Sequence, residues 1–225
     1  MAKHRGPPDE VAAILRELIK ALDVIDPANE RRVGDAKYGV YAFFDYDDEP
    51  IYVGQTTEQL RVRIRRHLTN QRTDAVAMNV LDPFEVADIE MWPFWDLHDA
   101  WEQAEKSEER SEVRERAKQR LNSAEFSLFQ QVLEASQFGA VLNEKPPDEA
   151  ETMSLPVSFR HRIVPPDIYR RRVHPDVRIA QRAATIARLA DVISRRQVKP
   201  GLRATLVVQA KRLLHLSESR LREVE

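Results

Sequence analysis

Three short stretches decide the fold of this chain: YGVYAFF at residues 38–44, IYVG at 51–54 and LRVRIRRHL at 60–68. The first two are rich in aromatic and β-branched residues, and the polar, proline-containing sequence DYDDEP separates them. This pattern is typical of two strands joined as a hairpin. In the third stretch Leu60, Ile64 and Leu68 recur at a spacing of four, which predicts a helix with one buried face.

The pattern extends to both sides of this centre. Residues 84–91 alternate apolar and polar side chains and predict a third strand. A helical stripe from residue 9 to residue 25 predicts an N-terminal helix, and a long charged helix is expected from about residue 99 to 134. Two further helices are expected at about 176–197 and 202–224, separated by Lys199-Pro200-Gly201. Their predicted apolar stripes comprise Ile179, Ala183, Ile186, Ala190 and Ile193 in the first, and Leu206, Ala210, Leu213 and Leu214 in the second.

These elements predict an α+β fold. A small three-stranded antiparallel sheet is flanked by helices, with an N-terminal helix and a C-terminal α-helical hairpin. The expected divisions are an N-terminal helix and lead-in at 1–37, a core at 38–144 with a charged helical insertion at about 99–120, a linker at 145–158, and a basic arm with the hairpin at 159–225. The proline-broken arm is expected to be irregular.

Charge is distributed unevenly along the chain. Residues 1–155 hold 19 Lys and Arg against 31 Asp and Glu, a net charge of −12, whereas residues 156–225 hold 16 against 6, a net charge of +10. A basic C-terminal region attached to an acidic body either meets a polyanion or balances the body within one fold. The charge pattern alone does not separate these two readings.

Composition excludes several classes of protein. The chain has no cysteine, so disulfides and thiolate metal sites are excluded. No apolar stretch approaches the length needed to span a membrane, and the first residues lack the apolar core of a signal peptide. We therefore expect a cytoplasmic protein without membrane partners.

Two tyrosines and the following helix place candidate catalytic side chains at the predicted hairpin. Tyr41 and Tyr52 lie on adjacent strands, where pairing can set the two phenols side by side. Arg63 and His67 lie four residues apart and therefore share one helical face. Each of the strand tripeptides Gly39-Val40-Tyr41 and Tyr52-Val53-Gly54 is common by itself, but the two together with this helix form a much rarer combination.

The series Gly39-Val40-Tyr41, Tyr52-Val53-Gly54, Arg63, His67, Glu125 and Asn143 resembles the GIY-YIG nuclease family, over about half of the chain. The resemblance implies a three-stranded antiparallel sheet with helices and one divalent metal ion per active site, Mg²⁺ or Mn²⁺. It also implies that Tyr41 and Tyr52 are the motif tyrosines and that Arg63 contacts the scissile phosphate.

The same resemblance assigns the remaining site residues. His67 stands where family members have His or Tyr, and Glu125 would be the carboxylate that binds the metal. Asn143 would close the active site, together with the motif glycines Gly39 and Gly54.

Physical chemistry is consistent with these roles. Hydrolysis of a phosphodiester needs a positioned water, a group that accepts its proton, and neutralisation of charge on the phosphate oxygens. One carboxylate suffices for a Mg²⁺ ion that keeps most of its water ligands. The planar fork of an arginine suits a bidentate contact with phosphate. We expect a metal, Arg63 and His67 to lower the pKa of Tyr41 and thereby favour a proton relay through it.

Arginines outside this set are candidates for binding nucleic acid. On the helix they are Arg61, Arg65 and Arg66, and in the arm and hairpin they are Arg160, Arg162, Arg170, Arg171, Arg172, Arg178 and Arg182. The alternatives are a solvated loop for the arm and a homodimer through the C-terminal helices for the hairpin. A cluster of Trp92, Phe94, Trp95, His98 and Trp101 is read as core packing in preference to a base-stacking surface.

The sequence therefore predicts a metal-dependent endonuclease that acts on DNA, double-stranded DNA above all. Restriction or phage defence is the favoured context, with repair and mobile-element nucleases as alternatives. A competing hypothesis is a non-catalytic nucleic-acid-binding module on the same fold, and a third is a helical assembly protein dominated by the C-terminal hairpin.

Overall fold

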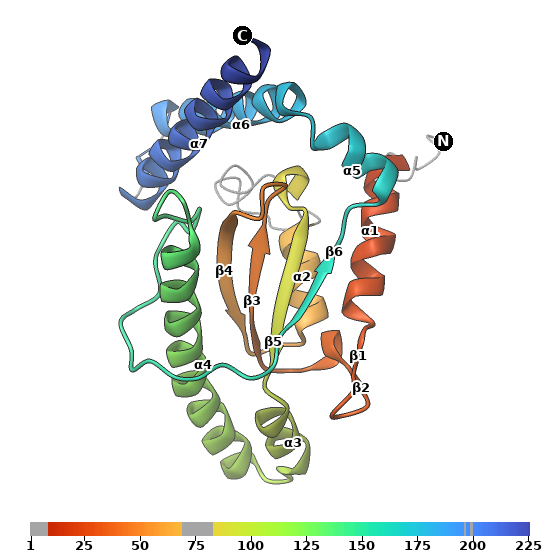
Figure 1. Cartoon of the computed structure of the whole chain (residues 1–225). Helices are drawn as coiled ribbons and strands as arrows, with labels where there is room; N and C mark the ends of the chain where they lie inside the picture. The colour runs from red at the N-terminus through yellow and green to blue at the C-terminus, as the bar shows by residue number, and fades with distance from the viewer. Residues whose placement is uncertain (1–8, 69–82, 196, 199) are drawn as a thin grey trace, which may run out of the picture.

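A computed structural model of the chain describes residues 9–68, 83–195, 197–198 and 200–225. Its centre is a four-stranded antiparallel sheet with the order β4-β3-β5-β6 (Figure 1). The strands are β3 (Gly39–Phe44), β4 (Pro50–Thr56), β5 (Asp88–Pro93) and β6 (Phe159–Arg162). The predicted α+β fold, with its antiparallel sheet and C-terminal helical hairpin, is confirmed.

The fourth strand was not predicted. β6 comes from the arm expected to be irregular, and it pairs with β5 through Met91↔Phe159 to Asp88↔Arg162. The arm also forms the short helix α5 (Pro166–Arg172). The prolines that suggested irregularity lie between and at the start of these elements, where a proline costs no hydrogen bond.

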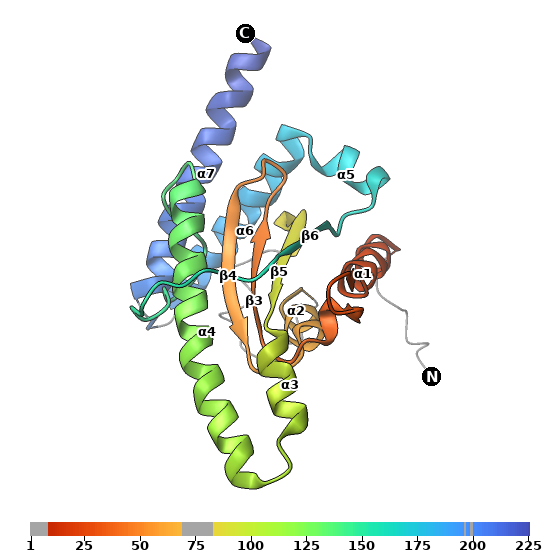
Figure 2. The ribbon, with the colours of Figure 1, turned by 60° about the horizontal axis from the view of Figure 1, so that its bottom comes forward.

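Helices cover both faces of the sheet (Figure 2). One face carries Tyr41 and Phe43 and packs against α1 (Asp9–Leu22) and α2 (Leu60–Leu68). The other face carries Val40, Ala42 and Val53 and packs against α4 (Ser107–Ala135). The alternation of side chains along β3 and β4 therefore supplies two separate cores, one on each face.

The long charged helix predicted from residue 99 is two helices. α3 (Trp95–Gln103) ends at Ala104, and α4 begins at Ser107. The Glu109 side chain accepts from the backbone N–H groups of Glu105 and Lys106, so it caps the start of α4. The aromatic cluster is mostly core, since Trp92, Phe94 and Trp95 are buried.

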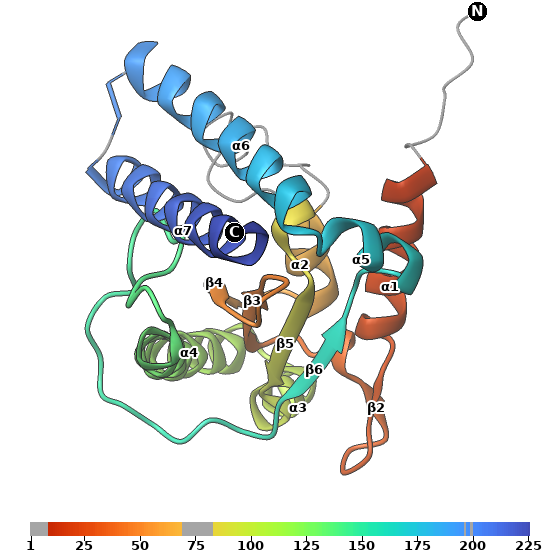
Figure 3. The ribbon, with the colours of Figure 1, turned by 45° about the horizontal axis from the view of Figure 1, so that its top comes forward.

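α6 (Pro175–Arg195) and α7 (Pro200–Val224) form the C-terminal hairpin, which lies beside the loop that follows α4 (Figure 3) and beside the β3–β4 turn. Three buried arginines of this hairpin reach Asp45 in that turn. Asp45 Oδ2 lies 2.6 Å from Arg212 Nη2, 3.2 Å from Arg182 Nη2 and 3.5 Å from Arg178 Nη2. The hairpin is thus held to the sheet by buried charges.

The segment predicted as a linker, 145–158, has no helix or strand, and the division of the chain into domains remains a prediction. Within the described residues, no helix combines the length and apolarity that crossing a membrane requires.

Candidate active site

An aromatic cluster forms the centre of the candidate site on the α2 face of the sheet. Tyr41 on β3 and Tyr52 on β4 stack with ring centroids 6.2 Å apart. The His67 ring on α2 lies 5.1 Å from the Tyr52 ring and 5.9 Å from the Tyr41 ring. The hairpin register explains this arrangement, because Tyr52 pairs with Phe43, two residues from Tyr41 on the same face.

Gly54 makes room for Tyr41. It pairs directly with Tyr41 across the hairpin, and a Cβ atom at Gly54 would lie 2.7 Å from both Cζ and Oη of that tyrosine. At Gly39 a Cβ would lie 3.0 Å from both Leu60 Cδ atoms and from the Trp92 carbonyl oxygen. Both motif glycines are therefore required by close packing next to the site.

Arg63 reaches the aromatic cluster from α2. Leu60 and Ile64 are buried and fix the helix, so that Arg63 and His67 face the sheet together. Arg63 Nε donates a hydrogen bond to Tyr41 Oη over 3.3 Å. Burial acts to lower the pKa of Arg63, but the neighbouring phenols of Tyr41 and Tyr52 outweigh it, and the guanidinium stays charged.

The pKa of Tyr41 differs in direction from the expectation. Complete burial raises it well above the usual value for a tyrosine, the nearby Tyr52 raises it further, and the Arg63 guanidinium opposes this only in part. Of the groups expected to lower this pKa, the Arg63 guanidinium does so, but burial outweighs it. Desolvation of the phenolate exceeds the attraction of one cation, and Tyr41 keeps its proton.

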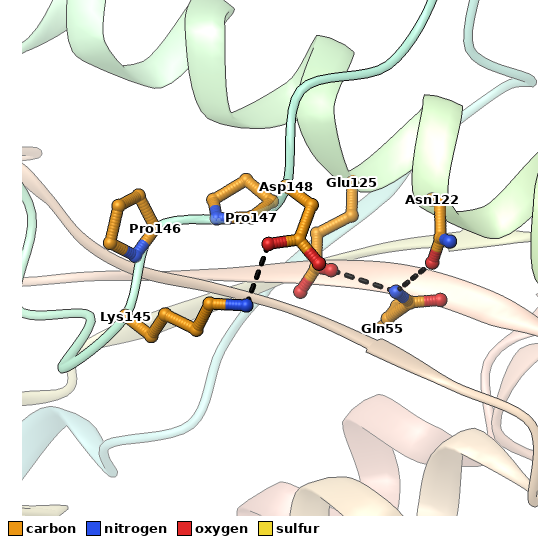
Figure 4. A pocket seen from close by; sticks show the side chains of 7 residues that line it. All are labelled: Gln55, Asn122, Glu125, Lys145, Pro146, Pro147 and Asp148. Atoms are coloured by element: carbon orange, nitrogen blue, oxygen red, sulfur yellow. Dashed lines mark hydrogen bonds and ion pairs between the residues drawn. The ribbon is translucent and has the colours of Figure 1, made fainter.

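Glu125 approaches from the other face of the sheet. It lies on α4, which packs against β4, and β4 is an edge strand of the sheet. The Gln55 side chain on β4 donates from Nε2 to Glu125 Oε2 and to Asn122 Oδ1, each over 2.8 Å (Figure 4). A carboxylate only accepts hydrogen bonds, so this contact fixes the orientation of the Gln55 amide.

The carboxylate and the guanidinium therefore lie on opposite sides of the strand β4. Tyr52 and Gly54 point to the Arg63 face, while Gln55 points to the Glu125 face, because successive residues of a strand alternate. The two groups still act on each other, since the charge of Arg63 lowers the pKa of Glu125. A substrate that crosses the edge of β4 could contact both.

A hollow of about 190 Å³ opens beside Glu125. It is lined by Gln55, Asn122, Glu125, Lys145, Pro146, Pro147 and Asp148 (Figure 4). Asp148 forms an ion pair of 2.6 Å with Lys145. Its charge also raises the pKa of Glu125.

The charge state of Glu125 is set by opposing effects. Burial raises its pKa above the usual value, whereas the hydrogen bonds from the Gln55 side chain and backbone, and the charge of Arg63, lower it. The net pKa lies above the usual value, so the carboxylate is more easily protonated than an exposed glutamate.

The donors in the hollow suit a hard divalent cation. Carboxylate and amide oxygens are the ligands that Mg²⁺ and Mn²⁺ prefer, and the hollow has room for an ion that keeps several water ligands. The described part of the chain contains no cluster of three or more His, Asp or Glu side chains arranged to hold a metal. The donor set therefore fits an ion held by one or two carboxylates and water, not a closed protein cage.

Asn143 closes one side of β4. Its Oδ1 accepts from the Val53 N–H over 3.1 Å, and its Nδ2 donates to the Val53 carbonyl oxygen over 2.8 Å. Next to it, the Leu142 N–H donates to the Ile51 carbonyl oxygen over 2.8 Å. The side chain thus replaces a neighbouring strand at the position between Tyr52 and Gly54.

The arginines predicted to bind nucleic acid are mostly engaged with carboxylates. Arg61 pairs with Asp23 and Asp35, and Arg66 pairs with Glu58. Among the arginines of the arm, Arg160 and Arg162 pair with Asp88, and Arg171 pairs with Glu10. These side chains remain partly or fully exposed, as do Arg65 and Arg170.

Three of the predicted arginines have a different placement. Arg172, Arg178 and Arg182 are buried, and all three form ion pairs, with Glu10, Asp47 and Glu85 among their partners. A buried guanidinium that already neutralises a carboxylate has no free face for a DNA phosphate. Their placement supports a structural role instead, in docking the C-terminal segment on the rest of the fold.

Sequence reasoning missed Gln55, Asn122 and Asp148. Gln55 directly follows the Tyr-Val-Gly triplet, and Asn122 precedes Glu125 by one helical turn, so a polar pair at these positions was a usable signal. Asp148 had no such signal, because only the path of residues 143–148 past α4 brings it to the hollow.

Residues 37–118 match the family model of the GIY-YIG catalytic domain. The matched segment includes β3, β4, α2, β5, α3 and the first part of α4. No curated protein and no solved structure matches the chain.

Proposed function

This chain carries a GIY-YIG catalytic domain, a nuclease domain that acts on phosphodiesters, and from this we propose that the protein is a metal-dependent endonuclease of double-stranded DNA. One observation supports the proposal above the others. Arg63 and Tyr41 are hydrogen-bonded on one side of the edge strand β4, and Glu125 stands in an open hollow on its other side. A cation and a metal-binding carboxylate placed in this way can act on the same phosphate.

We assign to Arg63 the binding of the scissile phosphate. Its Nε is held by the Tyr41 hydroxyl, and this leaves the two terminal nitrogens as a fork for two phosphate oxygens. Tyr41 then serves to position Arg63, because its own proton is retained by burial.

Tyr52 and His67 are assigned to proton transfer. Both are only partly buried, and their rings lie against each other at 5.1 Å. An imidazole can accept a proton near neutral pH, and a phenol next to it can pass one on. Glu125 would hold the divalent ion, which would supply Lewis-acid neutralisation of the phosphate charge.

The partly or fully exposed members of the predicted arginine set are proposed to hold the DNA backbone. They are Arg61, Arg65, Arg66, Arg160, Arg162, Arg170 and Arg171. Exchange of a carboxylate partner for a phosphate is inexpensive at a solvent-exposed site, because exposed ion pairs contribute roughly 0–1 kcal/mol. We propose restriction or phage defence as the context, supported only by the joining of a nuclease domain to a basic region.

Cleavage of supercoiled plasmid tests the activity. Wild-type protein should cut in Mg²⁺ and not in EDTA, and Glu125→Ala and Arg63→Ala should abolish cutting. Glu134→Ala is the matched control, because Glu134 is exposed on the same helix α4. Salt-sensitive DNA binding without cutting by the wild type would favour the non-catalytic binding module. Phage plating on cells that express wild-type or Glu125→Ala protein tests the context.

A further inference from the structure

Helix α7 has two opposite faces, a buried one of mixed character and an exposed one that carries apolar side chains. Its buried residues are Leu202, Thr205, Gln209, Arg212 and Leu216. They recur at alternating spacings of three and four, which is the stripe of a helix packed along one side. This inner face meets α6 and the sheet.

The outer face carries a second stripe. Val207, Leu214 and Leu221 are 54%, 58% and 55% exposed, and Val224 is 62% exposed. Among the described residues, four of the nine large hydrophobic side chains that are exposed lie on this one helix. Single exposed leucines need no explanation, but three at intervals of seven residues form a line along the helix. We call Val207, Leu214 and Leu221 the outer seam.

Two charges flank the outer seam on the same side. Lys211 lies three residues before Leu214, and Glu218 lies four residues after it, so both project from one flank of the seam. Both are exposed, and neither forms an ion pair with another described residue. A seam bounded by an unpaired cation and an unpaired anion is suited to a partner with complementary charges.

The seam is complementary to itself when it is reversed. In an antiparallel pairing centred on Leu214, Leu214 meets Leu214 of the second copy and Val207 meets Leu221. Lys211 then stands beside Glu218 of the second copy, and by symmetry the pair occurs twice. A parallel pairing would not bring these two charges together. A self-complementary patch of this kind is what a two-fold axis requires.

We propose that the protein forms a homodimer in which the outer seams of two α7 helices pack antiparallel about a two-fold axis at Leu214. The two strands of a DNA duplex are also related by a two-fold axis, so the dimer supplies one candidate active site for each strand. That consequence rests on the proposed nuclease function, whereas the pairing of the helices does not.

Cysteine cross-linking tests the pairing and its direction, because the natural chain has no cysteine. Leu214→Cys should form a disulfide-linked dimer under mild oxidation, since a disulfide needs Cα atoms within about 7 Å. Val207→Cys and Leu221→Cys should each stay monomeric on a non-reducing gel, because residues 14 positions apart are separated by roughly 21 Å along a helix. A mixture of these two variants should cross-link.

A charge exchange provides the second test. Lys211→Glu and Glu218→Lys each create two like-charged contacts, and each should raise the concentration at half-dimerisation in sedimentation by about tenfold or more. The double variant Lys211→Glu/Glu218→Lys should restore wild-type association, and an equimolar mixture of the two single variants should form the heterodimer. Lys118→Glu is the control, since Lys118 is also an exposed lysine but lies on α4.

The outcomes separate the two proposals. Wild-type protein that sediments as a monomer at micromolar concentration, or self-cross-linking of Val207→Cys as efficient as that of Leu214→Cys, would overturn the antiparallel dimer. If the protein dimerises but never cuts DNA, the proposed dimer is supported and the proposed nuclease function is rejected. Leu214→Glu that nicks one strand but no longer linearises plasmid would support both.

Discussion

The Gln55 side-chain amide is hydrogen-bonded to the Glu125 carboxylate over 2.8 Å, across the boundary between the sheet and α4. Gln55 lowers the pKa of Glu125 against the stronger effect of burial, which raises it. The negative charge of this carboxylate, which the proposed metal ion would require, therefore depends on a neutral side chain.

In the variant Gln55→Ala, the pH below which Mn²⁺ binding is lost is expected to be higher than in the wild type. Loss of the hydrogen bond from Gln55 raises the pKa of the Glu125 carboxylate, so binding fails at a pH where the wild type still binds. Calorimetric titration from pH 5 to 8 measures this shift. Gln119→Ala, an exposed glutamine on α4, should leave the profile unchanged. An unshifted profile for Gln55→Ala would show that Gln55 does not set the charge.

Gly54→Ala is expected to impair the site and the fold together. The new Cβ would lie 2.7 Å from the Tyr41 ring and hydroxyl, so the phenol must move away from Arg63. Overpacking of this kind costs about 1–3 kcal/mol, seen as a lower Tm, and cleavage should fall by at least tenfold.

Gly139→Ala is the matched control for that experiment. Gly139 has φ of +57° and no atom within 4 Å of its Cβ position. The alanine is strained by roughly 1–2 kcal/mol and lowers Tm as well, but it does not touch the site. Equal losses of cleavage in both variants would mean that stability, not the position of Tyr41, limits activity.

The two tyrosines are expected to respond differently to removal of the hydroxyl. Tyr41→Phe should reduce kcat by about tenfold through looser positioning of Arg63, with no change in the shape of the pH profile. Tyr52→Phe should reduce kcat by about 100-fold or more and flatten the profile, because it removes a proton carrier. Single-turnover cleavage across the pH range distinguishes them. The reverse order of effects would assign proton transfer to Tyr41.

Asp45→Asn is expected to destabilise the docking of the C-terminal hairpin. Arg178, Arg182 and Arg212 converge on this buried carboxylate. Arg178 and Arg182 keep Asp47 and Glu85 as partners, but Arg212 loses the one ion pair that it forms within the described residues, at a cost of about 3–5 kcal/mol. Urea unfolding and limited proteolysis after residue 164 measure the effect. Asp48→Asn, in the same turn but exposed, should change stability by less than about 1 kcal/mol.

The hairpin and the helix α2 could be predicted from the sequence because local signals agree there. Strand alternation, the polar turn DYDDEP and the leucine spacing of 60–68 each act over a few residues. The resulting geometry brings Tyr41, Tyr52, Arg63 and His67 together as expected. Burial of Tyr41, which raises its pKa, depends on distant elements and could not be predicted from these local signals.

In the C-terminal helices α6 and α7, the pattern of apolar residues in the sequence predicts the wrong buried face. In α6 the buried face contains Arg178, Arg182 and Thr185, and in α7 it contains Gln209 and Arg212, so the stripes predicted from apolar residues were displaced. Carboxylates in the β3–β4 turn and at Glu85 make burial of these arginines favourable. No pattern within the helices themselves reveals a partner 97 or more residues away along the chain.

The course of α4 limits how this catalytic-domain segment could be exchanged between proteins. The segment that matches the family ends at residue 118, in the middle of a helix that continues to Ala135 and carries Glu125. A graft cut at that point would lack the carboxylate and Asn143, and it would leave Asp45 and Glu85 without the arginines that neutralise them. The unit that could be transplanted extends into α7, so recombination within the chain would seldom yield a working chimera.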